Sequence, residues 1–430
     1  MPADVLVHLR WHDRKPLRLL SPADLALAVA ERLADDGRLR AAIDRTAHQT
    51  AHPASVRWRP ESLALGYPGL AVLAAELDRR DPDAGWDRPG HRWLSAATGD
   101  GDLSSAAPSL FGGWLGVAAA AHLASRDGKR YGALRSRLDE AFAAAVHRLD
   151  VAGGRGPHHG AGDDLIDGVT GWIAVLLLRR SSSTVVDELL GILARRLVHL
   201  LGADDGRPRL AVPATWLAPD QRVSSPHGYL DLGLAHGLSG MVAALASIRD
   251  RGVRVPGLGS AVRHGADLLA AHQEADGHWP RVLPLDRNGR PAGRIAAERP
   301  GWCYGTAGVA RALWLAGDRD HRLRAERGLR AALTPDSVDR LGSPTVCHGL
   351  AGLLLITKTF GPEFQTDTDS LAVRLGEQHR PGTLLGFQDV ENTGARVDNP
   401  GLLSGAAGVA LALLAVDSPT PPPWTGLLLL

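Results

Sequence analysis

The stretch Gly66–Leu77, GYPGLAVLAAEL, decides the fold of this chain, because its pattern recurs six more times. Two glycines three residues apart open a run of small apolar residues, which is typical of a buried helix. The pattern returns at Gly113 (GWLGVAAAAHL), Gly168 (GVTGWIAVLLL), Gly237 (GLSGMVAALA), Gly305 (GTAGVARALWLA), Gly349 (GLAGLLLI) and Gly405 (GAAGVALALLA). One such pair is weak evidence in a chain with 50 glycines, but seven pairs that each open an apolar run indicate an internal repeat.

Amphipathic stretches lie between the repeats, for example Leu134–Leu149 and Val185–Leu201, with apolar residues at helical spacing on one face and charges on the other. Each repeat therefore predicts an inner apolar helix and an outer amphipathic helix. A helix pair cannot bury its apolar face alone, so neighbouring pairs must stack. We predict an all-α fold, an α/α toroid of about seven inner and seven outer helices, as a single domain over residues 1–430. A linear solenoid of the same helix pairs is the alternative.

Three segments lack helical periodicity. Gly202–Asp231 and Glu274–Pro300 are rich in Gly, Pro and polar residues, which predicts long loops or small insertions over one end of the ring. The Pro-rich tail, residues 416–430, cannot be helical through its prolines, so Leu427–Leu430 either dock on the body or are disordered. At the repeat glycines we expect crowded backbones and turns that can require a positive φ.

Composition excludes several classes of protein. The chain has 48 Lys and Arg against 47 Asp and Glu, a formal net charge of +1, and no basic stripe with interleaved aromatic residues, so nucleic acid is not an expected partner. No apolar run approaches the roughly 20 residues of a membrane span, and charged residues interrupt the first 15 residues where a secretory signal would need an apolar core. We therefore expect a cytoplasmic protein without a transmembrane segment.

The reactive side chains fall just before the first glycine of a repeat. Cys303 and Cys347 stand two residues before it, His348 and His236 one residue before it, and Asp164 four residues before it. If the repeats are equivalent, this register places these side chains at one end of the ring, near the N-termini of inner helices. The partial positive charge of a helix N-terminus favours anions and lowers the pKa of a cysteine. Such a site suits metal-bound sulfur.

Cys303, Cys347 and His348 are a donor set that Zn²⁺ prefers, and three protein ligands leave one tetrahedral position open, as in catalytic zinc sites. The long gap between Cys303 and Cys347 does not match the short paired spacings of a structural zinc site. Two thiolates would cancel the charge of the ion, so a third, incoming thiolate would keep its nucleophilicity, which favours thiol alkylation over hydrolysis. The alternative is two buried, inert cysteines.

His236 is the other titratable residue directly before a repeat glycine, and at neutral pH it could donate or accept a proton. The alternatives for this group of residues are structural: His236 as a core histidine, Asp164 as a helix cap and Arg299, four residues before Cys303, as a loop residue in an ion pair. His158 and His159 lie in a Gly- and Pro-rich segment outside the register, and we interpret them as solvated.

Four features together resemble the lanthipeptide cyclases, the lanthionine synthetase C-like family: GWCYG at Gly301–Gly305, CHG at Cys347–Gly349, LAHG at Leu234–Gly237 and the seven glycine repeats. The resemblance spans Gly66 to Ala415. The length of the chain is similar to that of stand-alone class I members rather than of the C-terminal part of a bifunctional synthetase. Asp231 stands where the family pattern leads us to expect Asn.

The resemblance implies an α/α toroid with a central zinc bound by Cys303, Cys347 and His348. It implies the addition of precursor-peptide cysteine thiols to dehydroalanine or dehydrobutyrine, which closes lanthionine or methyllanthionine rings. His236 would then transfer a proton, with Asp164 near it, and Arg299 and Tyr304 would stabilise negative charge on an enolate oxygen. A dehydrated precursor peptide is the implied partner, and a dehydratase and an exporter are candidate partners in a modification complex.

Three other functions fit parts of the pattern. A relative that adds glutathione to dehydroamino acids would share every residue of the zinc site. A non-catalytic toroid could use zinc only for structure or for docking a peptide. A metal-free toroid glycosidase would need a pair of carboxylates in the mouth of the ring, and Asp163, Asp164 and Asp167 offer carboxylates on one segment only.

Overall fold

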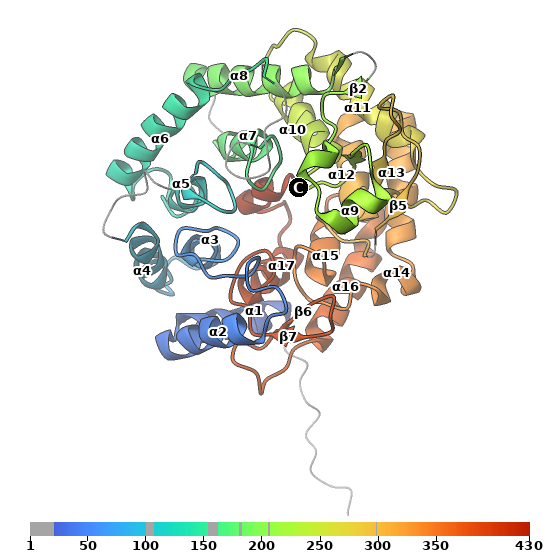
Figure 1. Ribbon diagram of the computed structural model, residues 1–430. Helices are drawn as coiled ribbons and strands as arrows, with labels where there is room; N and C mark the ends of the chain where they lie inside the picture. The colour runs from blue at the N-terminus through green and yellow to red at the C-terminus, as the bar shows by residue number, and fades with distance from the viewer. Residues whose placement is uncertain (1–20, 100–106, 154–161, 180–182, 205–206, 298) are drawn as a thin grey trace, which may run out of the picture.

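The computed structural model describes residues 21–99, 107–153, 162–179, 183–204, 207–297 and 299–430. Two concentric rings of helices make up the body of the molecule (Figure 1). The inner ring consists of α3 (Tyr67–Arg80), α5 (Trp114–Leu123), α7 (Val169–Leu177), α10 (Leu238–Asp250), α12 (Thr306–Ala316), α15 (Leu350–Lys358) and α17 (Ala406–Val416). The outer ring consists of α4 (Asp87–Thr98), α6 (Gly132–His147), α8 (Thr184–Leu200), α11 (Leu258–Ala271), α13 (Arg319–Ala332), α16 (Gln365–Glu377) and α1 (Pro22–Ala34).

The first helix closes the outer ring. Helix α1 packs against α17, so the N-terminal helix is the outer partner of the last inner helix. Helix α3 in turn packs against α17, which joins the first inner helix to the last. Helix α2 (Asp36–Gln49) then leads into the first repeat. The predicted α/α toroid is confirmed, and the linear solenoid is wrong because the ring has no free end.

Burial follows the predicted division between inner and outer helices. Every residue of α17 from Ala406 to Ala415 is buried, and small side chains there allow neighbouring helices to approach closely. Helix α13 buries only one side, and its arginines lie on the other. An apolar helix surrounded by others and an amphipathic helix facing solvent are the two sequence patterns that the repeats contain.

The first glycine of each repeat serves a close approach of backbones. At all seven positions an added Cβ would lie within 2.4 Å of a backbone atom, and at Gly66 it would lie 2.0 Å from the carbonyl oxygen of Arg59. The expectation of a positive φ is wrong here, because φ at these glycines runs from −158° to −96°. Crowding alone therefore accounts for glycine at these positions.

Seven backbone hydrogen bonds join the turns before the inner helices into a closed circle. Each runs from an N–H of one repeat to a carbonyl of the neighbouring repeat over 2.8–3.1 Å. In order around the ring, the pairs are Leu402 to Ala64, Ala64 to Phe111, Phe111 to Ile166, Leu165 to Ala235, Ala235 to Cys303, Cys303 to Cys347 and Cys347 to Leu403. Residues at equal register before the glycines therefore lie at one end of the ring.

The second glycine of each repeat lets the neighbouring repeat pack. A Cβ on Gly116 would lie 2.7 Å from the Cβ of Leu63 and 2.7 Å from the carbonyl oxygen of Leu110. Leu63 belongs to the preceding repeat, and the same contact recurs between Gly308 and Leu234 at 3.0 Å. Both glycines of the pair are thus needed for the ring to close at its inner radius.

Short antiparallel strands fill the two segments that the sequence assigns to loops or insertions. Strands β3 (Tyr229–Asp231), β4 (Pro280–Pro284) and β5 (Ile295–Ala296) form a sheet in that order, with Leu230 opposite Leu283. Strands β1 (Ala203–Asp204) and β2 (Arg207–Pro208) pair within the first of these segments. Strands β6 (Asp389–Val390) and β7 (Arg396–Val397) pair in a third segment, which the sequence analysis did not single out. Strands this short have no readable alternation, so the sequence pattern could not indicate them.

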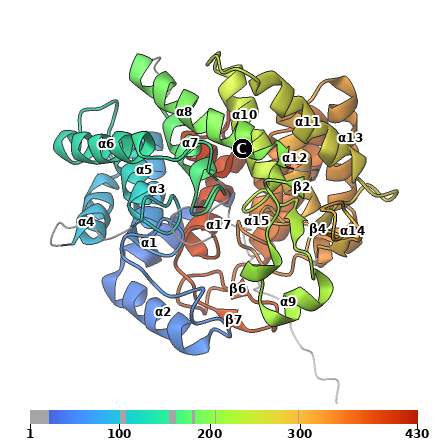
Figure 2. The ribbon, with the colours of Figure 1, turned by 45° about the horizontal axis from the view of Figure 1, so that its top comes forward.

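The insertions gather at one end of the ring. Figure 2 shows β6, β7 and α9 (Pro219–Ser224) beyond one end of the inner helices. The remaining helices in the described residues are short: η1 (Ala214–Trp216), α14 (Pro335–Asp339), η2 (Pro362–Phe364) and η3 (Pro423–Leu428).

The C-terminal tail docks inside the ring rather than staying disordered. Its 3₁₀ helix η3 begins at the last proline, and Trp424 and Leu428 are buried. The indole Nε1 of Trp302 donates a hydrogen bond to the carbonyl oxygen of Leu428 over 3.1 Å. The tail thereby supports the residue directly before Cys303.

Substitution of a second glycine tests the packing between repeats. We expect Gly116→Ala to lower the free energy of unfolding by about 1–3 kcal/mol, because the new methyl group overlaps Leu63. Gly132→Ala is the matched control, since nothing lies within 4 Å of its added Cβ, and it should leave stability unchanged or slightly higher. Urea unfolding followed by circular dichroism measures both. Equal stability of the two variants would contradict the packing role.

Candidate active site

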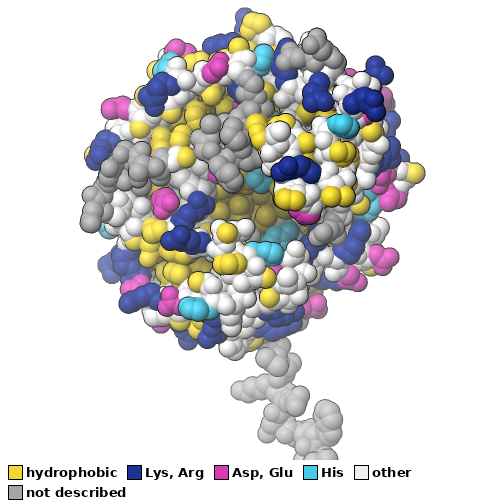
Figure 3. Space-filling model, in the orientation of Figure 1, with side chains coloured by type: hydrophobic (Ala, Val, Ile, Leu, Met, Phe, Trp, Pro, Cys, Tyr) yellow, Lys and Arg dark blue, Asp and Glu magenta, His cyan; other side chains and the backbone are white. Residues whose placement is uncertain are grey.

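A cavity of about 350 Å³ opens at the end of the ring that carries the insertions. Figure 3 shows this face hollowed near its centre, with hydrophobic side chains at the bottom of the hollow and histidine side chains at its rim. The cavity brings together Cys303, Cys347 and His348 with Arg299 and Tyr304. Five of the seven predicted site residues thus line one pocket.

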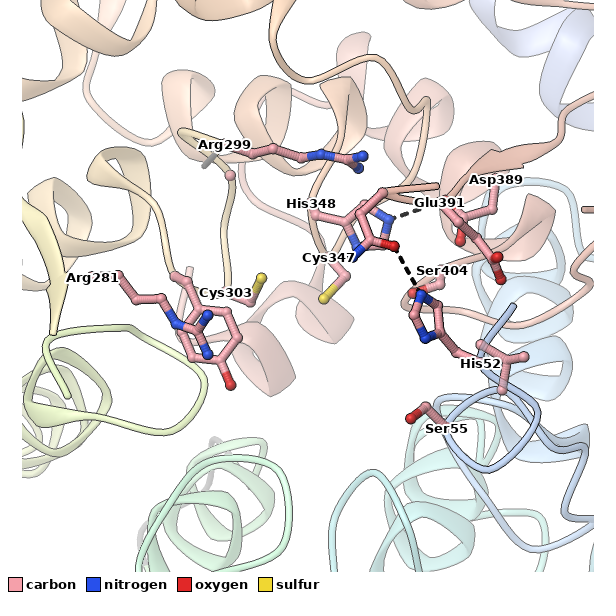
Figure 4. Close-up of a pocket in the computed structure, with 14 residues that line it drawn as sticks. His52, Ser55, Arg281, Arg299, Cys303, Cys347, His348, Asp389, Glu391 and Ser404 are labelled. Carbon is pink, nitrogen blue, oxygen red and sulfur yellow. Dashed lines mark hydrogen bonds and ion pairs between the residues drawn. The ribbon is translucent and has the colours of Figure 1, made fainter. Parts of the chain in front are cut away.

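The two cysteines stand side by side because they occupy neighbouring positions in the hydrogen-bonded circle. The N–H of Cys303 donates to the carbonyl of Cys347 over 3.1 Å, and Figure 4 shows both sulfurs directed into the same space. Both cysteines are free thiols. The two residues precede α12 and α15, so the N-terminal ends of two inner helices point toward this pair.

The environment divides the two thiols into a donor and an acceptor. A hydrogen bond from Cys347 to Cys303, opposed by burial and helped by the nearby charges of His348 and His236, lowers the pKa of Cys303 to about 7. The same hydrogen bond, together with burial, raises the pKa of Cys347 well above its usual range. The thiolate form is therefore favoured at Cys303 and disfavoured at Cys347.

His348 is oriented by a residue that the sequence analysis did not single out. Its Nε2 lies 3.0 Å from Oδ1 of Asp389, and this carboxylate oxygen also accepts a hydrogen bond from the Ser343 hydroxyl over 2.8 Å. Burial acts to lower the pKa of His348, but the hydrogen bond and charge of Asp389 outweigh it and raise that pKa. With Nε2 held by Asp389, Nδ1 is the nitrogen left for a ligand.

His236 and Asp164 form a second pair beside the thiols. The Nδ1 of His236 lies 2.6 Å from Oδ2 of the buried Asp164, as their register predicts. Burial acts to lower the pKa of His236, but the hydrogen bond and charge of Asp164, with the charges of Asp231 and Cys303, raise it overall.

Tyr304 directly follows Cys303 in the chain and contacts His236 of this pair. Its ring stacks on that of His236, with 5.6 Å between centroids and 24° between planes. Burial, then the negative charges of Asp231 and Cys303, raises the pKa of Tyr304 well above its usual range. Its hydroxyl therefore keeps its proton at neutral pH and can donate a hydrogen bond.

Arg299 reaches the cavity from the segment before Cys303. Its Nη1 donates to the carbonyl oxygen of Val390 over 3.2 Å, so strand β6 holds it in place. Its positive charge acts to lower the pKa of His348. Arg299 forms no ion pair with any residue in the described parts of the chain, so the interpretation of Arg299 as a loop residue in an ordinary ion pair is not supported.

The residues present fit a thiophilic metal by donor type. No group of three or more His, Cys, Asp or Glu side chains in the described ranges is close enough to hold a metal ion as the side chains stand. Two sulfurs nevertheless face one space, and an imidazole in the same cavity has its second nitrogen held by a carboxylate, an arrangement that orients metal-binding histidines. Zinc is the metal that this donor set favours.

The carboxylates that a glycosidase would need are engaged elsewhere. Asp163 forms a buried two-point ion pair with Arg196, with distances of 2.8 and 2.9 Å, and Asp164 is bound to His236. Asp167 accepts a hydrogen bond from the Ser109 hydroxyl over 2.6 Å. This leaves no opposed carboxylate pair from that segment. His158 and His159, interpreted as solvated, lie outside the described residues.

Two further cavity residues, Asp389 and Arg281, were missed by the sequence analysis. Both lie in segments between repeats, so the glycine register cannot place them. For Arg281, the only signal was its position in the long Gly- and Pro-rich segment Glu274–Pro300, where functional residues are common. For Asp389, one aspartate among the 47 acidic residues carries no local signal.

Comparison with known proteins points to one family. The sequence model of the family "Lanthionine synthetase C-like protein" matches residues 57–429. The nisin biosynthesis protein NisC of Lactococcus lactis subsp. lactis is 25% identical over 360 residues, which cover 76% of this chain and 82% of NisC. The solved structure of a nisin cyclase matches with a TM-score of 0.72 at 21% identity, over 91% of this chain and 97% of that one.

A second solved structure is similar in fold alone. An unsaturated glucuronyl hydrolase from Bacillus sp. GL1 matches with a TM-score of 0.50 at 13% identity, over 94% of this chain and 98% of the hydrolase.

Within the described parts of the chain, no helix combines the length and the apolar character needed to cross a membrane.

Replacement of Asp164 tests the electrostatics of its pair with His236. We expect Asp164→Asn to lower the pKa of His236 relative to wild type, because the raising charge and charged hydrogen bond of Asp164 disappear while burial, which lowers this pKa, remains. Titration of the ring protons by NMR in wild type and variant measures the shift. An unchanged or higher pKa would contradict the assigned cause.

Proposed function

The chain belongs to the lanthionine synthetase C-like family, and on this premise we propose that it is a cytoplasmic, zinc-dependent lanthipeptide cyclase. It adds cysteine thiols of a dehydrated precursor peptide to dehydroalanine or dehydrobutyrine and so closes lanthionine or methyllanthionine rings. The observation that carries the proposal is the meeting of two thiols and one oriented imidazole in one cavity, with the His236–Asp164 pair stacked against Tyr304 of its lining.

The sulfurs of Cys303 and Cys347 and the Nδ1 of His348 would hold the zinc ion. Bound zinc supplies a Lewis acid that lowers the pKa of a peptide thiol and keeps its sulfur at the cavity. The two protein thiolates would cancel the charge of the ion, which would preserve the nucleophilicity of an incoming sulfur. The low pKa of Cys303 supports this role, because thiolates rather than thiols bind metals.

His236 moves the proton of the reaction. It accepts the proton of the peptide thiol, and after the sulfur has bonded to the β-carbon it returns a proton to the α-carbon. Asp164 fixes the ring through Nδ1 and raises the pKa of His236, which makes the ring a stronger base toward the thiol proton. No other proton source or oxidant is required, since the addition conserves all atoms of the peptide.

Arg299 and Tyr304 act on the negative charge that develops on the substrate. Addition of a sulfur to a dehydroamino acid moves a pair of electrons toward the adjacent carbonyl oxygen. The protonated Tyr304 hydroxyl and the Arg299 guanidinium are donors of the type that stabilises such an oxygen. The dehydro residues must come from an earlier dehydration step, so a dehydratase is the expected partner, with an exporter as a further member of the complex.

Replacement of His236 separates catalysis from zinc binding. We expect His236→Ala to lower the rate of ring closure by roughly 10²–10⁴-fold, as loss of a general acid–base does, with zinc retained. Cys347→Ala should lose both zinc and activity. His321→Ala is the matched control, because His321 contacts Asp318 and Asp267 on the outer ring, far from the cavity.

The assay incubates each protein with a dehydrated precursor peptide, alkylates free thiols and counts them by mass spectrometry. Undiminished free thiols with the cognate peptide would contradict the proposed function. Glutathione adducts without ring closure would favour glutathione addition instead. A fully active His236→Ala variant would contradict the proposed role of His236.

Asp389 provides a test of the zinc proposal that needs no substrate. We expect Asp389→Asn to weaken zinc binding by about 10- to 100-fold, because the carboxylate orients His348. Competition with a chelator measures the affinity. Asp369→Asn, on the exposed side of α16, serves as the control. Equal zinc affinity in both variants would exclude His348 as an oriented ligand.

A further inference from the structure

We propose that Arg281 is a further catalytic residue, whose guanidinium binds the carbonyl oxygen of the dehydro residue and stabilises the negative charge that forms on it. The inference rests on the proposed function. Arg281 lies outside the repeat register and in none of the motifs that point to the family.

Arg281 is the extra residue of an irregularity in the sheet. Between β4 and β5, Pro280 pairs with Ala296 and Val282 with Ile295, so β4 has one residue more than its partner at this point. The carbonyl of Arg281 accepts a hydrogen bond from Leu232 on the other side over 3.0 Å. Bulges of this kind redirect a side chain and are common beside active sites. Here the side chain is directed into the cavity with Cys303 (Figure 4).

Among the described residues, the guanidinium of Arg281 has an aromatic neighbour but no hydrogen-bonding partner. Its Cζ lies 4.2 Å from the centroid of the Tyr304 ring. Its Nε is buried without a hydrogen bond, and across the described residues no carboxylate pairs with it. Arg196, by contrast, is buried with both hydrogen bonds of its pair to Asp163 satisfied. No described side chain therefore accepts a hydrogen bond from this guanidinium, and a ligand oxygen in the cavity that Arg281 lines would accept one from its outer nitrogens.

The place of Arg281 relative to His236 identifies the oxygen. Tyr304 contacts both residues, stacking on the His236 ring and lying beneath the Arg281 guanidinium. The α-carbon that accepts the proton and the carbonyl oxygen that accepts the charge are only two bonds apart. The proton donor and the cation therefore both lie beside Tyr304, the residue that follows Cys303, where the attacking sulfur and the dehydro residue would meet.

Negative groups and a cation act on the Tyr304 hydroxyl. Cys303 and Asp231 both raise the pKa of the Tyr304 hydroxyl, and Arg281 is the cation that opposes them. A planar guanidinium offers two parallel donors to an oxygen, which a lysine cannot reproduce. The cation thus compensates the additional negative charge that sulfur addition creates.

The step balances without another reactant. The sulfur–carbon bond forms at the β-carbon, and the electron pair of the double bond moves to the carbonyl oxygen, where Arg281 holds it. The pair then returns to the α-carbon as His236 delivers a proton there. The thiol proton that His236 accepted is the one transferred, so neither an oxidant nor a reductant takes part.

Arg281→Met, which keeps the length of the side chain but removes the charge, tests the proposal. We expect kcat for ring closure to fall by roughly 10²–10³-fold, the cost of losing one donor to a developing oxyanion, with KM changed only a few-fold. Arg281→Lys should recover only part of this loss. Arg330→Met is the matched control, because Arg330 lies 4.7 Å over the Phe364 ring on the outer ring of helices.

Chemical rescue distinguishes a direct role from a packing role. Added guanidinium ion should restore part of the activity of Arg281→Ala and should not accelerate wild type or Arg330→Ala. The zinc content and the thermal unfolding midpoint of the Arg281 variants should match those of wild type. If the kcat of Arg281→Met lies within about threefold of that of an active wild type, or if guanidinium does not rescue Arg281→Ala, the proposed role of Arg281 is wrong. The proposed function is not affected by either result. No ring closure by zinc-loaded wild type would overturn the proposed function and this inference together.

Discussion

The circle of seven backbone hydrogen bonds at one end of the ring is the constraint on which the rest of the structure depends. Each bond joins the turn before one inner helix to the turn before the next, and the last returns to the first. Glycines must precede the inner helices because the backbones approach too closely there for a Cβ. Residues at one register are thereby brought to one end, and Cys303 and Cys347 become neighbours although 44 residues separate them along the chain.

The fold and most of the cavity could be predicted because they repeat. The glycine pairs indicate seven equivalent units, and equal register places Cys303, Cys347, His348, His236 and Asp164 together. The structure brings His236 to Asp164 as this register predicts. What the repeats do not contain could not be predicted in the same way. Asp389 and Arg281 reach the cavity from short strands between repeats, and their positions depend on pairing partners that no local pattern identifies.

The division between repeats and insertions also divides the chemistry. Repeat turns supply the sulfurs, the imidazoles and Tyr304, all fixed at the N-terminal ends of inner helices. Insertions supply Asp389, which orients His348, and Arg281, which faces Tyr304. The rigid ring thus provides the donors for a metal, and the less regular segments provide the groups that orient and complement them. The first glycine of each repeat is required because the backbones are crowded there, and not because its backbone is left-handed.

The central claim is that the closed ring assembles a zinc site from two sulfurs and one imidazole. X-ray absorption at the zinc edge of the zinc-loaded protein tests it most directly. The account predicts two sulfur neighbours at about 2.3 Å and nitrogen or oxygen neighbours at about 2.0–2.1 Å, with a third sulfur appearing when a thiol peptide is added. A zinc ion surrounded only by nitrogen and oxygen, or one that gains no sulfur from the peptide, would contradict it.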